Sequence, residues 1–571
     1  MMDKRTLWVV VACIVALLGW QLLVNKLYPP KPKPLKPAVQ ATATNVAPAQ
    51  AEKIATNVAA AIKEAPPEPE APRPPEKLVV LSNQFVHVEF TSWGGGIRSV
   101  ELLKYKANGH GNVVLNSSAS VPALALGGVP GAGGNDVFQI EQPDSRSVVM
   151  RARLKTGAEV VKRISLGPDY LLSGNLQVSS SPPGEVTTQN VAIVIGEATP
   201  VTPREQQQYY LGVDWFAAGR YQNRPLARLW KNAGRGITNE HVQAQWAAVK
   251  SQFFAMILTP ATDSVEVAYE PIRLAMPAEW SGNVPPDGVS ASLEVPPISV
   301  TNGVATYAFT YYAGPKEYDR LAALGKGQED VMQFGFWGVI SVWLLKSMKL
   351  LYHVIPNYGI AIIIITILIK LIFWPIQAKS IRSMKEMQKF QPLMNKLREK
   401  YKDDPQRLNQ EMMKLYKEHK INPFSGCLPM LVQIPVFFGL YAMLRSAIEL
   451  RGASFLWVKD LSQPDTIWSH TLPFSLPLIG STLMLNPLPL LMTGAMIWQQ
   501  KLTPTAGDTQ QQKMMQFMPL IMLYFFYPSS SGLCLYWTAQ QLLSIAQQWW
   551  SLRQRDGTSA PAIPLSAGKA K

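Results

Sequence analysis

The chain has 571 residues, a formal net charge of +15 and only three cysteines. This length exceeds a single domain, and the long polar region after the first apolar segment has no cysteine, which excludes a disulfide framework there. Because 47% of the residues are hydrophobic and only 16% are charged, the composition is typical of a membrane protein. In a membrane protein, an excess of basic residues indicates loops that lie in the cytoplasm and contact anionic lipid headgroups.

The N-terminal part separates into two segments. Residues 1–27 contain an 18-residue apolar stretch at 7–24 with no small-x-small cleavage site after it, so we expect an uncleaved transmembrane anchor. Residues 28–76 are rich in Pro and Ala and nearly free of aromatic residues. They cannot bury a core, which predicts a disordered linker.

Residues 77–325 have the pattern of a large antiparallel β-sandwich, because short alternating strands are separated by Gly and Pro clusters. The clearest predicted strands are 86–90, 148–155, 160–164, 264–269 and 304–312, followed by a short helix at 318–324. In 326–356, Gln333, Lys346 and Lys349 interrupt an aromatic-rich run. We interpret that run as an amphipathic helix over 330–355 in the outer membrane interface, with Trp at headgroup depth.

The region 357–550 predicts a core of five membrane-spanning helices. The expected spans are 359–376, 425–446, 474–500 with its apolar part starting near 483, 515–528 and 532–550. Lys370 lies inside the first span, where an ammonium costs about 2.5–3.5 kcal/mol on insertion scales. It can face a wet protein interior or reach one interface by snorkelling. Thr366 lies four residues earlier, on the same helix face.

The loops between these spans predict the orientation. Residues 377–423 hold twelve Lys and Arg, whereas 449–472 holds only Arg451 and Lys459. The positive-inside rule then places 377–423 and the basic tail 551–571 in the cytoplasm. With one anchor before it, the sandwich is exported and the N-terminus is cytoplasmic.

Polar residues in the last span suggest a hydrophilic groove. Tyr536, Gln540, Ser544 and Gln547 recur at helical spacing, with Trp537 beside them. Because polar side chains in lipid need partners or water, this stripe should face the bundle interior. There it could line a groove with Thr366, Lys370, Gln433 and Tyr441. The alternative is a set of interhelical hydrogen bonds that only hold the bundle together.

Residues 378–421 predict a cytoplasmic antiparallel helical hairpin, broken at 403–405. Its methionines include Met384, Met387, Met394, Met412 and Met413. Flexible, polarizable side chains suit a docking surface for varied apolar segments. The alternative is that they only pack the two helices against each other.

Motifs for catalysis or cofactor binding do not occur. The sequence has no HExxH, no GxSxG and no phosphate-binding glycine loop, and its histidines lack metal-ligand spacing. We therefore predict no metal, no cofactor and no sequence-specific nucleic-acid binding. A Ser/Lys dyad of Lys370 with Ser544 or Ser531 is the one enzymatic alternative.

Three blocks resemble the YidC/Oxa/Alb family. They are NYGIAIIIITILIKLIFWPI at 357–376, QRLNQEMMKLYKEHKINPFSGCLPMLVQIPVFFGLY at 406–441 and MMQFMPLIMLYFFYPSSSGLCLYW at 514–537. The exported sandwich, with WGGGIRSVELLKY and WAAVKSQFFAMILTP, is similar to the Gram-negative YidC type. The resemblance implies five core helices around a groove that opens to cytosol and lipid in the bacterial inner membrane. It also implies insertion and folding of nascent membrane proteins, alone or with the Sec translocon. The ribosome and the signal-recognition machinery are further expected partners.

The same resemblance implies roles for individual residues. The groove charge falls on Lys370, with Thr366 one turn earlier, and the aromatic contact of the last span falls on Trp537 next to Tyr536. The cytoplasmic hairpin falls on 378–421. Bacterial members usually carry arginine where this chain has Lys370, so the charge is kept but the fork geometry is lost. A polytopic transporter and a scaffold of the Sec machinery remain the alternative functions.

Overall fold

The structure of this protein is a computed structural model. It describes residues 74–107, 111–129, 131–154, 158–179, 190–202, 205, 207–230, 237–274, 286–402, 404–419, 428–476, 480–502 and 509–553. The predicted anchor (1–27), nearly all of the predicted linker (28–76) and the tail after 553 lie outside the described residues.

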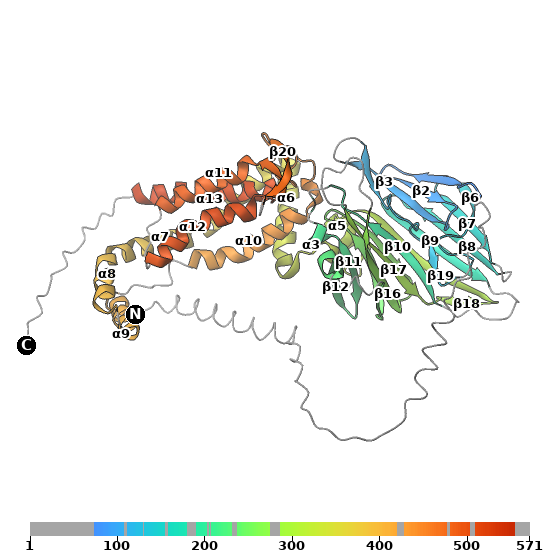
Figure 1. Ribbon diagram of the computed structural model, residues 1–571, viewed down its shortest axis with the longest axis horizontal. Coiled ribbons are helices and arrows are strands. Elements are labelled where there is room, and N and C mark those ends of the chain that lie inside the picture. Colours follow the sequence, from blue (N-terminus) through green and yellow to red (C-terminus); the bar gives the residue numbers. More distant parts are fainter. Residues whose placement is uncertain are drawn as a thin grey trace, which may run out of the picture. The chain divides into compact units, whose positions relative to one another are not determined.

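The antiparallel strands between Leu78 and Pro315 form three sheets (Figure 1). The largest has ten strands, ordered β12-β11-β14-β15-β19-β9-β8-β7-β6, with β18 paired to β19. Their bounds are β6 Gln139–Asp144, β7 Ser147–Arg153, β8 Glu159–Leu166, β9 Leu171–Ser179, β11 Gly212–Ala217, β12 Arg220–Pro225, β14 Ala244–Lys250, β15 Phe254–Pro260, β18 Ser299–Thr301 and β19 Val304–Pro315.

The second sheet has five strands, ordered β13-β16-β17-β10-β5, and the third has four, ordered β1-β2-β3-β4. Their bounds are β5 Leu126–Gly127, β10 Val191–Ala198, β13 Thr238–Glu240, β16 Glu266–Arg273 and β17 Asp287–Val295, and β1 Leu78–Ser82, β2 Val86–Thr91, β3 Gly96–Lys106 and β4 Asn112–Leu115. Two short helices, α3 (Gln207–Tyr210) and α4 (Leu226–Leu229), lie between strands.

The five-stranded sheet packs on the ten-stranded sheet through β10 and β17 against β11, β14 and β15. Alternation explains the packing: in β9, Leu172, Leu176 and Val178 point inward, while Ser173 and Gln177 are exposed. Side chains of period two fill the space between sheets in this way. The predicted antiparallel sandwich is therefore confirmed.

The predicted helix at 318–324 is α5, Tyr318–Leu324. The predicted helix over 330–355 begins later than expected. Two 3₁₀ turns, Gln328–Met332 and Gly335–Trp337, precede α6, which covers Gly338–Val354. Gln333 and Gly335 have φ of 57° and 64°. This left-handed backbone cannot continue an α-helix. The interfacial position of α6 stays a prediction.

The remaining long helices form a bundle, in which they lie side by side (Figure 1). They are α7 Tyr358–Lys389, α10 Leu428–Ser446, α11 Pro487–Leu502, α12 Thr509–Phe526 and α13 Ser531–Arg553. Within the described residues, Tyr358–Ser383 of α7 is the one helical stretch long and apolar enough to cross a membrane, and α12 has a shorter apolar stretch, Gln516–Phe526. The count of five spans therefore stays a prediction.

One predicted boundary was wrong, and one helix is longer than the span predicted in it. The first span was expected over 359–376, and α7 continues beyond it to Lys389, with Pro375 inside the helix. The third was expected from 474 or 483, but β20 (Trp468–Leu476) and β21 (Gly480–Leu485) form a hairpin there, and α11 begins at Pro487. Hydropathy detects apolar stretches only, so it did not locate the polar end of α7. It also does not distinguish an apolar hairpin from an apolar helix.

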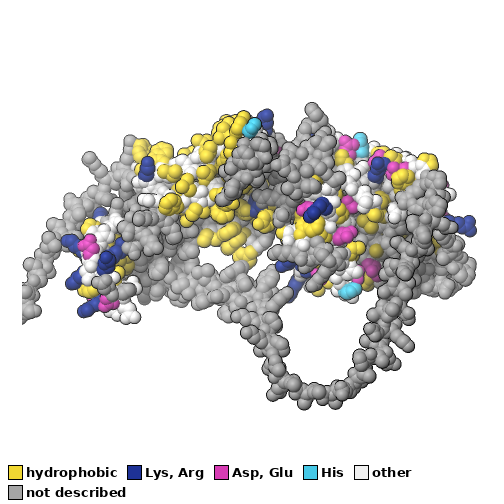
Figure 2. Space-filling view, in the orientation of Figure 1, with side chains coloured by type: hydrophobic (Ala, Val, Ile, Leu, Met, Phe, Trp, Pro, Cys, Tyr) yellow, Lys and Arg dark blue, Asp and Glu magenta, His cyan; other side chains and the backbone are white. Residues whose placement is uncertain are grey.

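The helices share one apolar core, and many of their outer side chains are also apolar. Buried members of this core include Leu345, Ile365 and Leu440. Ile372 of α7 is 63% exposed and Phe525 of α12 is 62% exposed. Figure 2 shows hydrophobic side chains gathered over the helices. An apolar exterior around an apolar core is expected where the surrounding solvent is lipid.

The arms of the helical hairpin belong to a second compact unit. Its arms are α8, Gln391–Lys400, and α9, Pro405–Glu418. The side chain of Asp404 caps α9 by accepting a hydrogen bond from the Arg407 amide at 3.0 Å. Residues 378–389 of the predicted hairpin belong instead to α7.

Candidate functional site

Lys370 is buried between α7 and α13. Its side chain is only 5% exposed, although the surrounding sequence of α7 is apolar. Its Nζ donates a hydrogen bond to Ser544 Oγ on α13 at 2.8 Å. Ser544 Oγ in turn donates to the Gln540 carbonyl oxygen at 2.8 Å. The ammonium therefore has a polar partner inside the bundle, across 174 residues of sequence.

Thr366 lies one turn before Lys370 and is fully buried. Its hydroxyl donates to the Ile362 carbonyl oxygen of its own helix at 2.7 Å. This local bond satisfies the hydroxyl proton and leaves the oxygen as an acceptor. Further along α7, Gln377 and Ser380 are also buried. The polar stripe of α7 thus continues from Thr366 and Lys370 through Gln377 to Ser380, toward the basic end of the helix.

A second polar contact joins α10 to α13. Gln433 Nε2 donates to the Tyr536 hydroxyl at 3.0 Å, and Tyr536 is fully buried. The next residue, Trp537, packs its ring on Phe437 with centroids 5.0 Å apart and on Phe526 with centroids 5.4 Å apart. Gln433, Tyr536 and Trp537 are therefore brought together where α10 and α13 meet.

Helix α13 links the two contacts. Tyr536, Gln540 and Ser544 are spaced by four residues, so they follow one face of the helix. Among the described residues, Trp537 Nε1, Gln540 Oε1 and Gln547 Nε2 are buried polar atoms without a hydrogen-bond partner. Buried polar atoms in native proteins are nearly always satisfied by protein, water or ligand. This face of α13 can therefore bind water or the polar groups of a substrate.

The methionines proposed for docking differ in their surroundings. Met394 of α8 is 2% exposed, and its sulfur accepts a hydrogen bond from the Tyr416 hydroxyl at 3.6 Å. It therefore packs the two arms together. Met413 of α9 is 50% exposed and Met412 is half-buried. Met387 lies on α7 rather than on the hairpin, and the side chain of Met384 lies outside the described residues.

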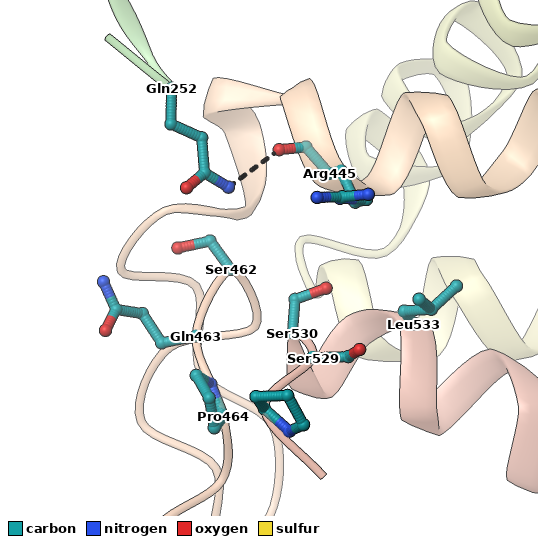
Figure 3. Close-up of a pocket in the computed structure, with 9 residues that line it drawn as sticks. Gln252, Arg445, Ser462, Gln463, Pro464, Ser529, Ser530 and Leu533 are labelled. Atoms are coloured by element: carbon teal, nitrogen blue, oxygen red, sulfur yellow. Dashed lines mark hydrogen bonds between the residues drawn. The ribbon is translucent and has the colours of Figure 1, made fainter. Parts of the chain in front are cut away.

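A small polar cavity of about 30 Å³ lies at the beginning of α13, outside the predicted site (Figure 3). Next to it, Gln252 of the sandwich donates its Nε2 to the Arg445 carbonyl oxygen at 3.0 Å. The cavity is lined by Gln252, Arg445, Ser462, Gln463, Pro464, Pro528, Ser529, Ser530 and Leu533. A volume of this size accommodates water and no peptide segment, so this cavity is not a substrate path.

Comparisons with known proteins identify the family. Residues 78–347 match the model of the YidC periplasmic domain, and residues 350–558 match that of the 60Kd inner membrane protein. The membrane protein insertase YidC of Nitratidesulfovibrio vulgaris (strain DP4) is 34% identical over 97% of this chain and 100% of the relative. That of Syntrophus aciditrophicus (strain SB) is 33% identical over the same shares.

One similar solved structure is that of an active YidC insertase with its first transmembrane domain resolved. The alignment covers 83% of this chain and 92% of the chain in that structure. Its sequence identity is 18% and its TM-score is 0.34. The assignment rests on the full-length sequence relatives and on the two family models, which together cover the sandwich and the helical core. The chain therefore belongs to the YidC family of membrane protein insertases.

Proposed function

We propose that this chain inserts and folds nascent inner-membrane proteins through a hydrophilic groove lined by Lys370, Thr366, Gln433, Tyr536, Trp537 and Gln540. The observation that carries the proposal is the buried Lys370 on α7. Its Nζ contacts Ser544 on α13, the helix that also carries the unpartnered Gln540 Oε1 and Gln547 Nε2. An intramembrane ionisable residue of this kind marks a substrate or ion pathway by default.

The electrostatics explain how such a groove would act. A nascent segment with a polar, often acidic, outer tail must cross a slab of low dielectric. Two charged residues at the bilayer centre cost ~5–7 kcal/mol on insertion scales. Water and polar groups around Lys370 replace part of the hydration that the tail loses, while lipid accepts the apolar helix. No nucleotide hydrolysis is required, because the apolar helix ends in a favourable environment.

The proposed arrangement follows the charges of the loops. The helices α7, α10, α11, α12 and α13 span the inner membrane, both termini are cytoplasmic and the sandwich is periplasmic. The basic hairpin of α8 and α9 is the proposed docking element for nascent chains. The proposed partners are nascent membrane proteins, the Sec translocon, the ribosome, the signal-recognition machinery and membrane lipids.

The alternatives predict different behaviour. A transporter would need a pathway that opens on both sides of the membrane, and a scaffold would tolerate substitutions in the groove. The Lys370–Ser544 contact has the composition of a Ser/Lys dyad. However, the chain belongs to a family of insertases and is not an enzyme, so we assign this pair to the polar lining of the groove.

Site-specific photocrosslinking during translation tests the proposal. A photoreactive amino acid at 366, 370 or 537 should crosslink to a small membrane protein while that protein is being inserted. Leu371 provides a matched control, since it neighbours Lys370 on α7 and is 58% exposed. Its crosslinks should form mainly to lipid. Equal substrate crosslinking from 370 and 371, at matched expression, would contradict a groove at Lys370.

A further inference from the structure

The hairpin of β20 and β21 stands apart from the sheets of the sandwich. Its two strands pair antiparallel with each other, and neither pairs with another strand among the described residues. An isolated two-stranded hairpin is only marginally stable in water. This hairpin therefore needs firm attachment at its base and a surface to cover it.

The base of the hairpin is attached to the helical bundle. Asn486 Nδ2 donates to the Tyr527 carbonyl oxygen at 2.8 Å, and Thr466 Oγ1 donates to Asn486 Oδ1 at 2.8 Å. The carboxylate of Asp465, which is 5% exposed, accepts from the Leu488 amide in the first turn of α11 at 2.6 Å. The hairpin is thus held next to α11 and the end of α12.

One face of the hairpin is apolar and uncovered. In the register, Trp468 lies opposite Leu485 and His470 lies opposite Leu483, so these four side chains share a face. Trp468 is 52% exposed, Leu485 41% and Leu483 39%. The rings of Trp468 and His470 stack with centroids 6.0 Å apart.

The sequence around this face is also uncharged. Residues 466–500 contain no Asp, Glu, Lys or Arg. Edge strands in water normally carry charges that prevent pairing with other chains. The apolar surface continues into α11, where Leu490 and Leu491 are 43% and 52% exposed. The hairpin face and the outward side of α11 are therefore both apolar and uncharged.

We propose that the face formed by Trp468, His470, Leu483 and Leu485 lies in the headgroup region of the outer leaflet and binds lipid there. This inference rests on the proposed function, which places the connection between α10 and α11 on the outer side. A hairpin with free edges does not enter the hydrocarbon core, because its backbone groups would be unsatisfied. The headgroup region provides hydrogen bonds for the edges and an apolar boundary for Trp468.

A protein partner fits these observations less well. Protein interfaces carry a polar, solvent-accessible rim around their apolar centre, whereas the apolar surface here continues from the hairpin face to the exposed Leu490 and Leu491 of α11. Lipid also matches the position of the hairpin directly before α11. The hairpin would then fix the outer end of α11 at the membrane surface.

Fluorescence quenching in proteoliposomes tests the inference with the full-length chain. Cys13, Cys427 and Cys534 are replaced by Ala, and His470→Cys or Ser469→Cys is labelled with an environment-sensitive fluorophore. These neighbouring residues occupy opposite faces of β20. We expect blue-shifted emission at 470, strong quenching by nitroxides near the lipid headgroup and weak quenching by iodide. The label at 469 should show stronger iodide quenching and weaker lipid quenching.

Two results would overturn the inference. They are equal iodide quenching of the labels at 470 and 469, and protection of the label at 470 from both quenchers. Protection from both would indicate a protein or a second copy on this face. Labelling of Ser469→Cys in cells by a membrane-impermeant maleimide separates the two proposals. If Ser469→Cys reacts only after the inner membrane is opened, the proposed topology is contradicted. If it reacts from outside, the topology holds, and the quenching result then tests the lipid contact alone.

Discussion

Replacing Lys370 changes the charge of the proposed groove at one buried point. Its side chain is 5% exposed and its Nζ lies 2.8 Å from Ser544 Oγ. A substrate carboxylate about 5 Å from this ammonium, at an effective dielectric of about 20, gains ~3 kcal/mol. If that energy is realised in the barrier, Lys370→Ala should slow insertion of an acidic-tailed substrate by ~10²-fold. Lys370→Glu replaces attraction by repulsion and should lower the rate further.

Two variants distinguish the effect of the positive charge at position 370 from that of its hydrogen bond to Ser544. Lys370→Arg keeps the positive charge and should retain insertion. Ser544→Ala removes the acceptor but leaves the ammonium, so it should lower stability by about 1.5–3 kcal/mol, the range for a hydrogen bond to a charged group, without removing the charge that attracts the substrate. A Ser/Lys dyad predicts the opposite, because arginine cannot give up its proton and alanine cannot act as a nucleophile. Both variants would then fail completely.

The assay is protease protection of the translocated tail in cells depleted of the wild-type chain, with expression of the variants matched. One substrate has an acidic tail, and a second has a neutral tail of equal length. Only the acidic substrate should respond strongly to Lys370→Ala and Lys370→Glu. Equal insertion by all variants would support snorkelling, and failure of Lys370→Arg would refute the role of charge.

Three further predictions concern the parts around the groove. In the hairpin, Met413→Ser should weaken insertion while leaving the fold intact, whereas Met394→Ser should destabilise the two-helix unit, as limited proteolysis would show. Deletion of 384–416 should leave the protein folded in the membrane but impair insertion, and normal insertion of every substrate tested would contradict this. Deletion of 90–300 should preserve basic insertion at normal protein levels. Burial raises the pKa of Glu205 from 4.5 to about 7, so its contribution to stability is present below pH 4.5 and is lost as the pH rises to about 7. Glu205→Gln should therefore flatten the dependence of the melting temperature on pH in this window, and an unchanged pH dependence would contradict the buried position.

The sequence predicted elements with a clear period, but not contacts across long separations. Alternation located the strands of the sandwich, and a short helical pattern located α5 at Tyr318–Leu324. The spacing of Thr366 and Lys370 placed both on one face of α7. Their partners could not be predicted, because the contact of Lys370 with Ser544 spans 174 residues. Gln377 and Ser380 continue the same polar stripe of α7, and their spacing from Lys370 in the sequence is the pattern that indicates this.

Under the proposed function, the partner of Lys370 suits an insertase better than a static bundle. The Lys370 ammonium donates to the neutral hydroxyl of Ser544 at 2.8 Å. A charge-assisted hydrogen bond to a carboxylate would be stronger than this contact. An acidic tail that reaches Lys370 could therefore replace Ser544 as its partner and later leave again. A bundle selected only for stability gains little from a buried charge, because a hydrophobic residue of similar volume is often at least as stabilising. The pairing of Lys370 with a serine thus favours the transient binding that the proposed function needs.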